Sequence, residues 1–165
     1  MKSLPTLILL SSLSSLLPIA AQNAAPQEQT SFQTIHPKMD LAEGDTVVFL
    51  GDSITHQCLY TQYVEDYFYT RHPSMRLRFH NAGVGGDRAQ DALHRFDADV
   101  AAFKPKYVTI LLGMNDGTYR GFDQPTFDTY ERDMKEVLDR IKAIGAVAIP
   151  MTPTMHDSRA QRIRG

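Results

Sequence analysis

The chain has 165 residues, 42% of them hydrophobic, and a formal net charge of -2. This length and composition fit one globular domain with an ordinary apolar core. The charge is near zero and no cluster of basic residues is present, so we expect no nucleic-acid partner. The single cysteine excludes a disulfide within the chain.

The first residues have the pattern of an export signal rather than of a folded domain. Residues 1–21 combine an early lysine, a serine-interrupted apolar run and two terminal alanines suited to cleavage. We therefore expect a signal peptide, a secreted or periplasmic location and no stable membrane anchor. Residues 22–40 have no periodicity and are predicted to be a flexible lead-in. The folded domain is then expected over residues 41–165.

Beyond the lead-in, short apolar runs alternate with helical stripes. The predicted strands are Thr46–Leu50, Arg76–His80, Tyr107–Leu112 and Ala146–Ile149. The predicted helical stripes run from Tyr60 to Phe68, from Ala89 to Phe103 and from Phe127 to Ile144. Strands that alternate with helices predict an α/β fold, in which a parallel sheet carries helices on both faces.

Polar residues follow each of the first three predicted strands. The clusters are Gly51-Asp52-Ser53, Asn81-Ala82-Gly83-Val84-Gly85-Gly86-Asp87 and Gly113-Met114-Asn115-Asp116. The carboxyl ends of parallel strands lie along one edge of a sheet, so the three clusters are expected to converge there. Ser53 follows a buried strand directly, which makes its hydroxyl a candidate nucleophile.

The second cluster also suggests a nucleotide-binding loop, but the pattern is incomplete. Gly83 and Gly85 begin like a dinucleotide fingerprint, yet Arg88 occupies the position of the third glycine. The Gly-Lys-Ser/Thr signature of a phosphate-binding loop is also absent. We therefore predict no cofactor and no metal.

Taken together and in this order, the three clusters resemble the GDSL esterases, also called SGNH hydrolases, whose four blocks carry Ser, Gly, Asn and His. The resemblance covers about Thr46 to Pro153. It implies a three-layer α/β/α fold with a flavodoxin-like parallel sheet. It also implies that Ser53 is the nucleophile. The backbone N–H groups of Ser53 and Gly86 and the side-chain amide of Asn115 would form the oxyanion hole.

Two features of that resemblance stay open. The donor glycine is assigned to Gly86, with Gly83 and Gly85 as alternatives. The last family block, Asp-x-x-His, has one match in spacing, from Asp91 to His94, which we interpret as a solvated helix face. The chain is therefore interpreted as a fragment that lacks the last strand, the last helix and the catalytic base, with a natural chain that lost its base as the alternative. Such a piece is expected to be weakly active or inactive by itself.

The resulting hypothesis is a secreted serine hydrolase of carboxylic esters, with acetylated carbohydrates as one candidate substrate. The partner would be a small-molecule or carbohydrate ester. His56, three residues after Ser53, and His156, after the last predicted strand, are candidate substrate contacts. The alternative is a non-catalytic carbohydrate- or ligand-binding domain of the same fold that lacks the base.

Overall fold

The computed structural model describes residues 39–154, which contain a parallel sheet of four strands in the order β2-β1-β3-β4. The strands are β1 (Thr46–Gly51), β2 (Arg78–Gly83), β3 (Tyr107–Leu111) and β4 (Val147–Pro150). This order belongs to flavodoxin-like sheets and confirms the predicted fold class. It also makes β1 a central strand, so the residues that follow β1 lie between the ends of β2 and β3.

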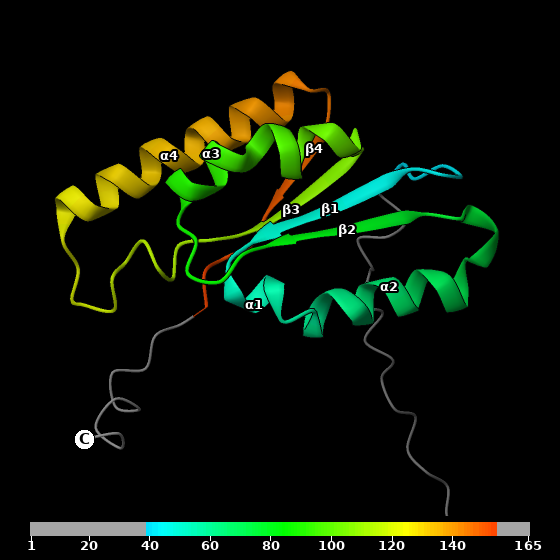
Figure 1. Ribbon diagram of the computed structural model, residues 1–165, viewed down its shortest axis with the longest axis horizontal. Helices are drawn as coiled ribbons and strands as arrows, with labels where there is room; N and C mark the ends of the chain where they lie inside the picture. The colour runs from blue at the N-terminus through cyan, green and yellow to red at the C-terminus, as the bar shows by residue number, and fades with distance from the viewer. Residues whose placement is uncertain (1–38, 155–165) are drawn as a thin grey trace, which may run out of the picture. The chain divides into compact units, whose positions relative to one another are not determined.

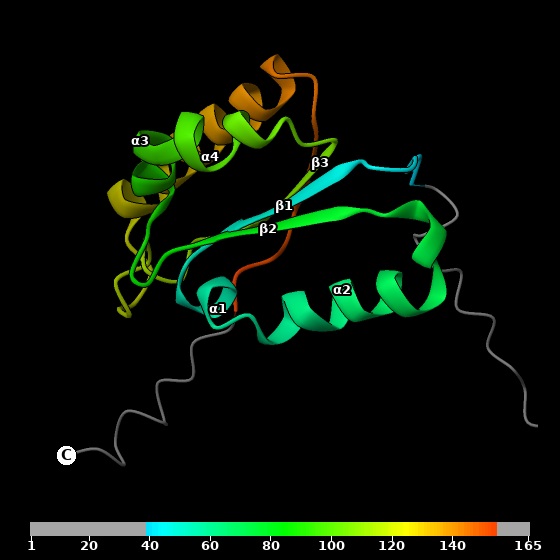
Figure 2. The ribbon, with the colours of Figure 1, turned by 45° about the vertical axis from the view of Figure 1, so that its right-hand side comes forward.

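Helices cover both faces of the sheet. The helices are α1 (Ser53–His56), α2 (Leu59–Arg71), α3 (Ala89–Asp99) and α4 (Gln124–Ala143), with short 3-10 turns η2 (Pro73–Met75) and η3 (Ala101–Phe103). Figures 1 and 2 show α1 and α2 on one face of the sheet and α3 and α4 on the other. This arrangement is the predicted three-layer α/β/α architecture.

Local sequence explains where the longest helix begins and ends. The Asp123 carboxylate accepts a hydrogen bond from the backbone N–H of Thr126 at 3.0 Å and so caps the start of α4. Pro125 lies in the first turn, where a missing N–H costs nothing. Gly145 follows the helix with a φ of 79°, a left-handed conformation that glycine adopts without strain.

The second strand differs from its prediction. We expected Arg76–His80, but β2 begins at Arg78 and continues to Gly83. Pro73 starts the turn η2 and Arg76 has a φ of 45°, so the chain becomes extended only afterwards. Pairing with β1, which places Gly51 opposite Gly83, then carries the strand further. The first part of the second polar cluster therefore lies within the sheet.

The helix α3 is also shorter than the apolar stripe of its sequence predicted. The stripe extends to Phe103, but α3 ends at Asp99 because Val100 leaves the helical conformation, with a φ of -123°. The turn η3 follows and contains Phe103. An apolar pattern of this kind records which residues face the sheet, whether the backbone is α-helical or 3-10.

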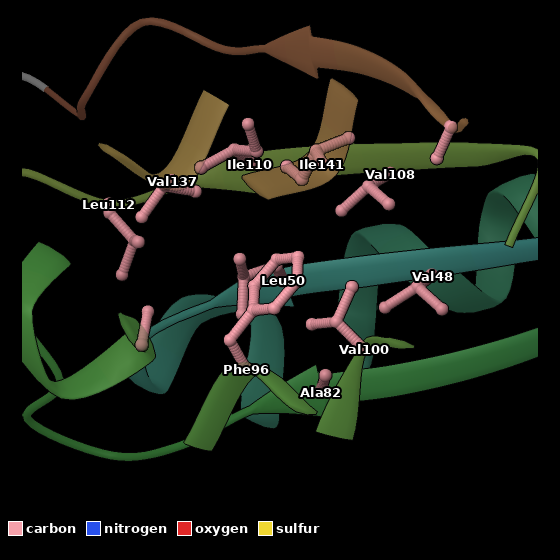
Figure 3. Packing of buried hydrophobic residues seen from close by; sticks show 12 residues of the cluster. Val48, Leu50, Ala82, Phe96, Val100, Val108, Ile110, Leu112, Val137 and Ile141 are labelled. Carbon is pink, nitrogen blue, oxygen red and sulfur yellow. The ribbon is translucent and has the colours of Figure 1, made fainter. Parts of the chain in front are cut away.

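The larger apolar core lies between the sheet and the helices α3 and α4 (Figure 3). Its twelve buried residues are Val48, Leu50, Ala82, Ala92, Phe96, Val100, Val108, Ile110, Leu112, Val137, Ile141 and Ala146. Neighbouring residues of β1 point to the opposite face, where Val47, Phe49 and Tyr107 form a smaller buried cluster. The alternation is that of a strand buried on both sides.

Some of the sequence predictions concern residues outside the range that the structure describes. The predicted signal peptide, most of the predicted lead-in and His156 lie outside residues 39–154. Within that range, Met39 and Leu41 already pack against the smaller cluster. None of the helices in the described range is both long enough and apolar enough to cross a membrane.

Candidate active site

Ser53 lies at the carboxyl end of β1 and is the first residue of α1. The preceding residue, Asp52, is only 1% exposed, and its Oδ1 accepts a hydrogen bond from the N–H of Ile54 at 2.9 Å. The N–H of Ser53 makes no hydrogen bond to any residue between 39 and 154. The serine is partly exposed.

Polar contacts and a glycine hold α1 against the sheet. The side-chain amide of Asn81 on β2 donates to the carbonyl of Thr55 at 2.7 Å, and the Thr55 hydroxyl contacts the Tyr60 hydroxyl at 2.9 Å. A Cβ at Gly83 would collide with the backbone N–H of His56. Glycine at this strand end therefore allows α1 to approach the sheet closely.

The loop after β2 separates the three candidate glycines. Gly83 is buried at the strand end, and its N–H donates to Oδ1 of Asn81 at 2.9 Å. Gly85 and Gly86 lie in the exposed turn that follows, and Gly86 has a φ of 86°. Among the described residues, the N–H of Gly86 has no hydrogen-bond acceptor. The N–H of Gly85 has none in this range either, so the unbonded N–H groups are those of Gly85 and Gly86, whereas that of Gly83 is bonded.

A buried ion pair ties this turn to the end of β1. The Arg95 guanidinium on α3 contacts the Asp87 carboxylate at 2.6 Å, and the two side chains are 16% and 10% exposed. The same guanidinium donates to the carbonyl of Gly51 at 3.3 Å and to Asp99 at 3.0 Å. A buried carboxylate needs such partners, because an unpaired one carries a large desolvation cost.

Asn115, in the loop after β3, joins the other two loops. Its Nδ2 donates to the backbone carbonyl of Asp87 at 2.9 Å and lies 3.5 Å from Oδ2 of Asp52. These two partners are the neighbours in sequence of Gly86 and Ser53. The predicted convergence of the three polar clusters is therefore observed, and the Asn115 amide lies between the other two loops.

Asp116, the residue after Asn115, makes a further contact between the loop after β3 and the start of α3. Its Oδ1 accepts a hydrogen bond from the N–H of Ala89, the first residue of α3, at 3.0 Å. Burial raises the pKa of the Asp116 carboxyl, while the hydrogen bond from Ala89 acts in the opposite direction. Its Oδ2 is buried and has no partner among the described residues. The side chain thus links the loop after β3 to the start of α3.

The histidines of the described region form no acid–base pair with Ser53. Nδ1 of His56 lies 3.2 Å from the carbonyl of Gly83, and the ring is exposed beside α1. His94 is exposed on α3, while Asp91 accepts the N–H of Arg88 at 3.0 Å and caps that helix. The Asp91–His94 spacing therefore lies on the solvated helix face, as interpreted from the sequence. The substrate contacts expected of His56 and His156 stay predictions.

A cavity of about 670 Å³ adjoins the loop that carries Asn115. Its walls come from that loop, from the start of α4 and from Pro153 beyond β4. Aromatic side chains line part of it, including Phe122, which is 80% exposed, and Phe127. Within residues 39–154, no group of three His, Cys, Asp or Glu side chains is placed to hold a metal ion.

Two residues of this junction were missed from the sequence. Arg95 lies between Ala92 and Phe96, both buried, so its position in the helical stripe was a signal that it faces inward. The hydroxyl of Tyr119 donates to Oδ1 of Asn115 at 2.9 Å. That contact depends on a turn with left-handed residues at Thr118 and Tyr119, for which the sequence carries no glycine signal.

The sequence of this chain matches one protein family and is similar to several known enzymes. Residues 49–164 match the GDSL-like lipase/acylhydrolase family. The chain is 29% identical to the acetylxylan esterase of Geobacillus stearothermophilus over 138 residues, which are 70% of this chain and 62% of that protein. It is also 29% identical to the thioesterase 1/protease 1/lysophospholipase L1 of Escherichia coli, over 67% of this chain and 51% of that protein. The chain spans about three fifths or less of the length of these relatives.

Solved structures give the same result. The crystal structure of the Geobacillus stearothermophilus acetylxylan esterase is similar with a TM-score of 0.61 and 27% identity, covering 76% of this chain and 69% of that chain. Catalytic mutants of that esterase have also been solved, with a serine, an aspartate or a histidine replaced by alanine. A gut microbial diltiazem-metabolizing enzyme is similar with a TM-score of 0.60 and 30% identity, over 66% of this chain and 27% of that chain.

Proposed function

This chain belongs to the GDSL-like lipase/acylhydrolase family, and on that premise we propose that the full-length protein hydrolyses carboxylic esters through an acyl-enzyme on Ser53. One observation carries the proposal. The Asn115 amide contacts the residue before Ser53 and the residue after Gly86, which supports a site built from the three loops. Acyl transfer requires a nucleophile together with hydrogen-bond donors.

In the proposed reaction, the Ser53 Oγ attacks the carbonyl carbon of the ester while a base removes its proton. The tetrahedral intermediate collapses as the bond to the alcohol oxygen breaks, and the proton passes to that oxygen. Water then attacks the acyl group on Ser53, and the acid leaves. Each step moves one proton between oxygen atoms and needs no electron carrier.

The negative charge of the tetrahedral oxygen would be held by the N–H groups of Ser53 and Gly86 and by the Asn115 amide. Two facts support this role for the backbone groups: neither N–H has a partner among the described residues, and both lie at the carboxyl edge of the sheet. The left-handed φ of Gly86 lets its turn present an N–H without a Cβ near the substrate. Losing one oxyanion donor typically lowers kcat about 10²- to 10³-fold.

The base lies, in this proposal, in the full-length protein beyond residue 154. His56 is tied to the carbonyl of Gly83, and His94 is exposed on α3, so neither is oriented by a carboxylate toward Ser53. The catalytic mutants of the similar acetylxylan esterase include an aspartate and a histidine besides the serine. We propose that an equivalent pair orients and shuttles the proton here.

Acetylated carbohydrates are the proposed substrates. Support comes from the similarity to an acetylxylan esterase. The cavity of about 670 Å³ next to the Asn115 loop, which Phe122 lines and Ser53 does not, offers an exposed apolar ring for a sugar face. The export pattern of residues 1–21 supports a secreted or periplasmic location, where polymeric carbohydrate esters are found. His56 and His156 are proposed to contact the substrate near Ser53.

The test is hydrolysis of p-nitrophenyl acetate and of acetylated xylo-oligosaccharides by the full-length protein, compared with its Ser53→Ala variant. Loss of the nucleophile is expected to lower kcat about 10⁴-fold or more. Ser74→Ala is the matched control, since Ser74 is exposed in η2, at the opposite end of β2 from the loops that surround Ser53. Equal rates for Ser53→Ala and the unaltered protein would refute the acyl-enzyme.

The same comparison tests the alternative of a non-catalytic carbohydrate-binding domain. Such a domain would bind acetylated oligosaccharides without releasing acetate, and Ser53→Ala would leave its affinity unchanged. Acetate release that depends on Ser53 excludes this alternative, and binding without release supports it. Asn115→Ala adds a second criterion, because only an oxyanion donor lowers kcat much more than it weakens substrate binding.

A further inference from the structure

The orientation of the Asn115 amide is fixed by what surrounds it. Its Nδ2 faces the Asp87 carbonyl at 2.9 Å and the Asp52 carboxylate at 3.5 Å. A carbonyl or carboxylate oxygen only accepts hydrogen bonds, so the nitrogen rather than the oxygen of the amide must occupy that side. The oxygen consequently points to the other side, where it accepts the Tyr119 hydroxyl at 2.9 Å.

The two Nδ2 protons are held with different strength. One makes a short bond to the Asp87 carbonyl, and the other faces Asp52 across 3.5 Å, at the outer limit for a hydrogen bond. Asp52 directly precedes Ser53, so the loosely held proton is the one on the nucleophile's side. For that proton to serve an oxyanion on Ser53, the 3.5 Å contact to Asp52 has to be exchanged while the amide stays in place.

The backbone around Tyr119 is arranged to bring its ring back toward Asn115. The N–H of Thr118 donates to the carbonyl of Asn115 at 3.2 Å and closes a turn. Thr118 and Tyr119 then follow with φ values of 54° and 55°. Neither is glycine, and the left-handed region is unfavourable for residues that carry a Cβ. A strained pair of residues thus ends in a side-chain hydrogen bond to Asn115.

We propose that Tyr119 is a positioning residue for ester hydrolysis: its hydroxyl holds Oδ1 of Asn115 and so keeps the Nδ2 proton directed at the oxyanion formed on Ser53. This inference rests on the proposed function for its catalytic consequence. The hydroxyl also polarises the amide, because a hydrogen bond to the oxygen makes the N–H of the same amide a stronger donor. Tyr119 acts through Asn115 and has no contact with the reacting atoms in this role.

The expected effect of removing the hydroxyl is set by the size of one neutral hydrogen bond. Tyr119→Phe keeps the ring and deletes only the donor, so kcat is expected to fall about 3- to 10-fold with KM unchanged. Tyr63→Phe is the matched control, since Tyr63 is 77% exposed on α2 and makes the same chemical change away from the three loops. Its kinetic constants should equal those of the unaltered protein.

A double-mutant cycle in the full-length protein tests whether Tyr119 acts through Asn115. If it does, Tyr119→Phe lowers kcat in the unaltered background and has no further effect in Asn115→Ala. An equal loss in both backgrounds overturns the proposal, and so does an unchanged kcat in the unaltered background. A merely structural role would lower stability and kcat in both backgrounds alike.

A second readout does not depend on activity. The side-chain amide resonances of Asn115 in a ¹⁵N–¹H correlation spectrum are identified by their loss in Asn115→Ala. Tyr119→Phe is expected to shift them, whereas Tyr63→Phe leaves them in place. Unchanged resonances in Tyr119→Phe overturn the contact. If the resonances shift but Ser53→Ala hydrolyses esters at the full rate, the positioning contact stands and the proposed esterase mechanism fails.

Discussion

On the sheet face covered by α3 and α4, twelve buried residues form one apolar cluster, whereas the cluster on the face of α1 and α2 contains three. The second face compensates with polar contacts. The Asn81 amide alone reaches Thr55, Thr61 and Cys58. Apolar burial is non-directional and stabilises, while hydrogen bonds are directional and fix position. The layer that carries Ser53 therefore has less apolar burial than the layer of α3 and α4, which is also tied by polar contacts of Arg95 and Asp116, and depends more on its directional contacts.

The comparison implies that the two faces respond differently to loss of an aromatic ring. Phe96→Ala on α3 removes a ring that is 1% exposed, and we expect the free energy of unfolding to fall by about 3–5 kcal/mol. Phe79→Ala on β2 removes a partly exposed ring from the smaller cluster and is expected to cost about half as much. Urea denaturation of the full-length protein measures both. A larger loss for Phe79→Ala would contradict the asymmetry between the faces.

The polar face is tested at Asn81. Asn81→Ala removes the amide's hydrogen bond to the carbonyl of Thr55, which keeps the N–H of Cys58, and leaves the N–H of Gly83 without its side-chain acceptor. We expect a loss of about 2 kcal/mol in the free energy of unfolding. We also expect kcat to fall, because α1 carries Ser53 and loses a directional contact to the sheet. Phe79→Ala is the control, since it weakens the same face without removing a hydrogen bond.

That pair of variants separates stability from position. If Asn81→Ala lowers kcat more than Phe79→Ala does, at similar stability, directional contacts set the place of Ser53. If kcat follows stability alone in both variants, then the polar contacts on this face act only as general stabilisers. The steady-state rates should be measured well below the unfolding transition of each variant.

The smallest change in stability is expected on substitution of Asp123, the exposed residue that caps α4. It serves as a reference for the buried polar contacts. Hydrogen bonds from the side chain and backbone of Thr126 hold the pKa of Asp123 below its ordinary value of 3.8. A lowered pKa in the folded state gives stability that is present above the ordinary value and is lost as the pH falls through the folded-state value. Asp123→Ala should remove this contribution, so its thermal stability should depend less on pH below about 5.

Asp123→Asn is the matched control for that measurement. Asparagine keeps an oxygen that accepts the N–H of Thr126 but does not ionise in this range. We expect it to preserve the cap at neutral pH and to lose the acid dependence. An unchanged acid dependence in Asp123→Asn would mean that another carboxyl group is responsible for it.

The places of β1 and β3 in the sequence, and the place of Ser53 directly after β1, were predictable because they depend on local patterns. Continuous apolar runs mark β1 and β3, and glycine with acidic or amide residues marks the turns after them. The bounds of β2 were not predictable in the same way. Arg78 to Gly83 alternates only weakly in hydrophobicity, and its length is set by pairing with β1.

The supporting contacts of the site were also beyond the sequence. Arg95 reaches the carbonyl of Gly51, 44 residues earlier in the chain, and Asn115 reaches Asp87, 28 residues earlier. Such pairs carry no local signature, because the residues between them fold into other elements. Tyr119 is close to Asn115 in sequence, but its contact requires left-handed backbone at Thr118 and Tyr119. Neither residue is glycine, so the sequence does not indicate this conformation.

By itself, the sequence determined the α/β architecture, the three polar clusters and the candidate nucleophile, because periodic burial and turn chemistry act over a few residues. Only the tertiary structure decided that the N–H of Gly83 is bonded while those of Gly85 and Gly86 are not within residues 39–154, which way the Asn115 amide points and what holds α1 in place. Those outcomes depend on side chains from separate strands competing for the same donors and acceptors. Packing across the sheet determines which donor meets which acceptor, and the local order of residues does not encode that choice.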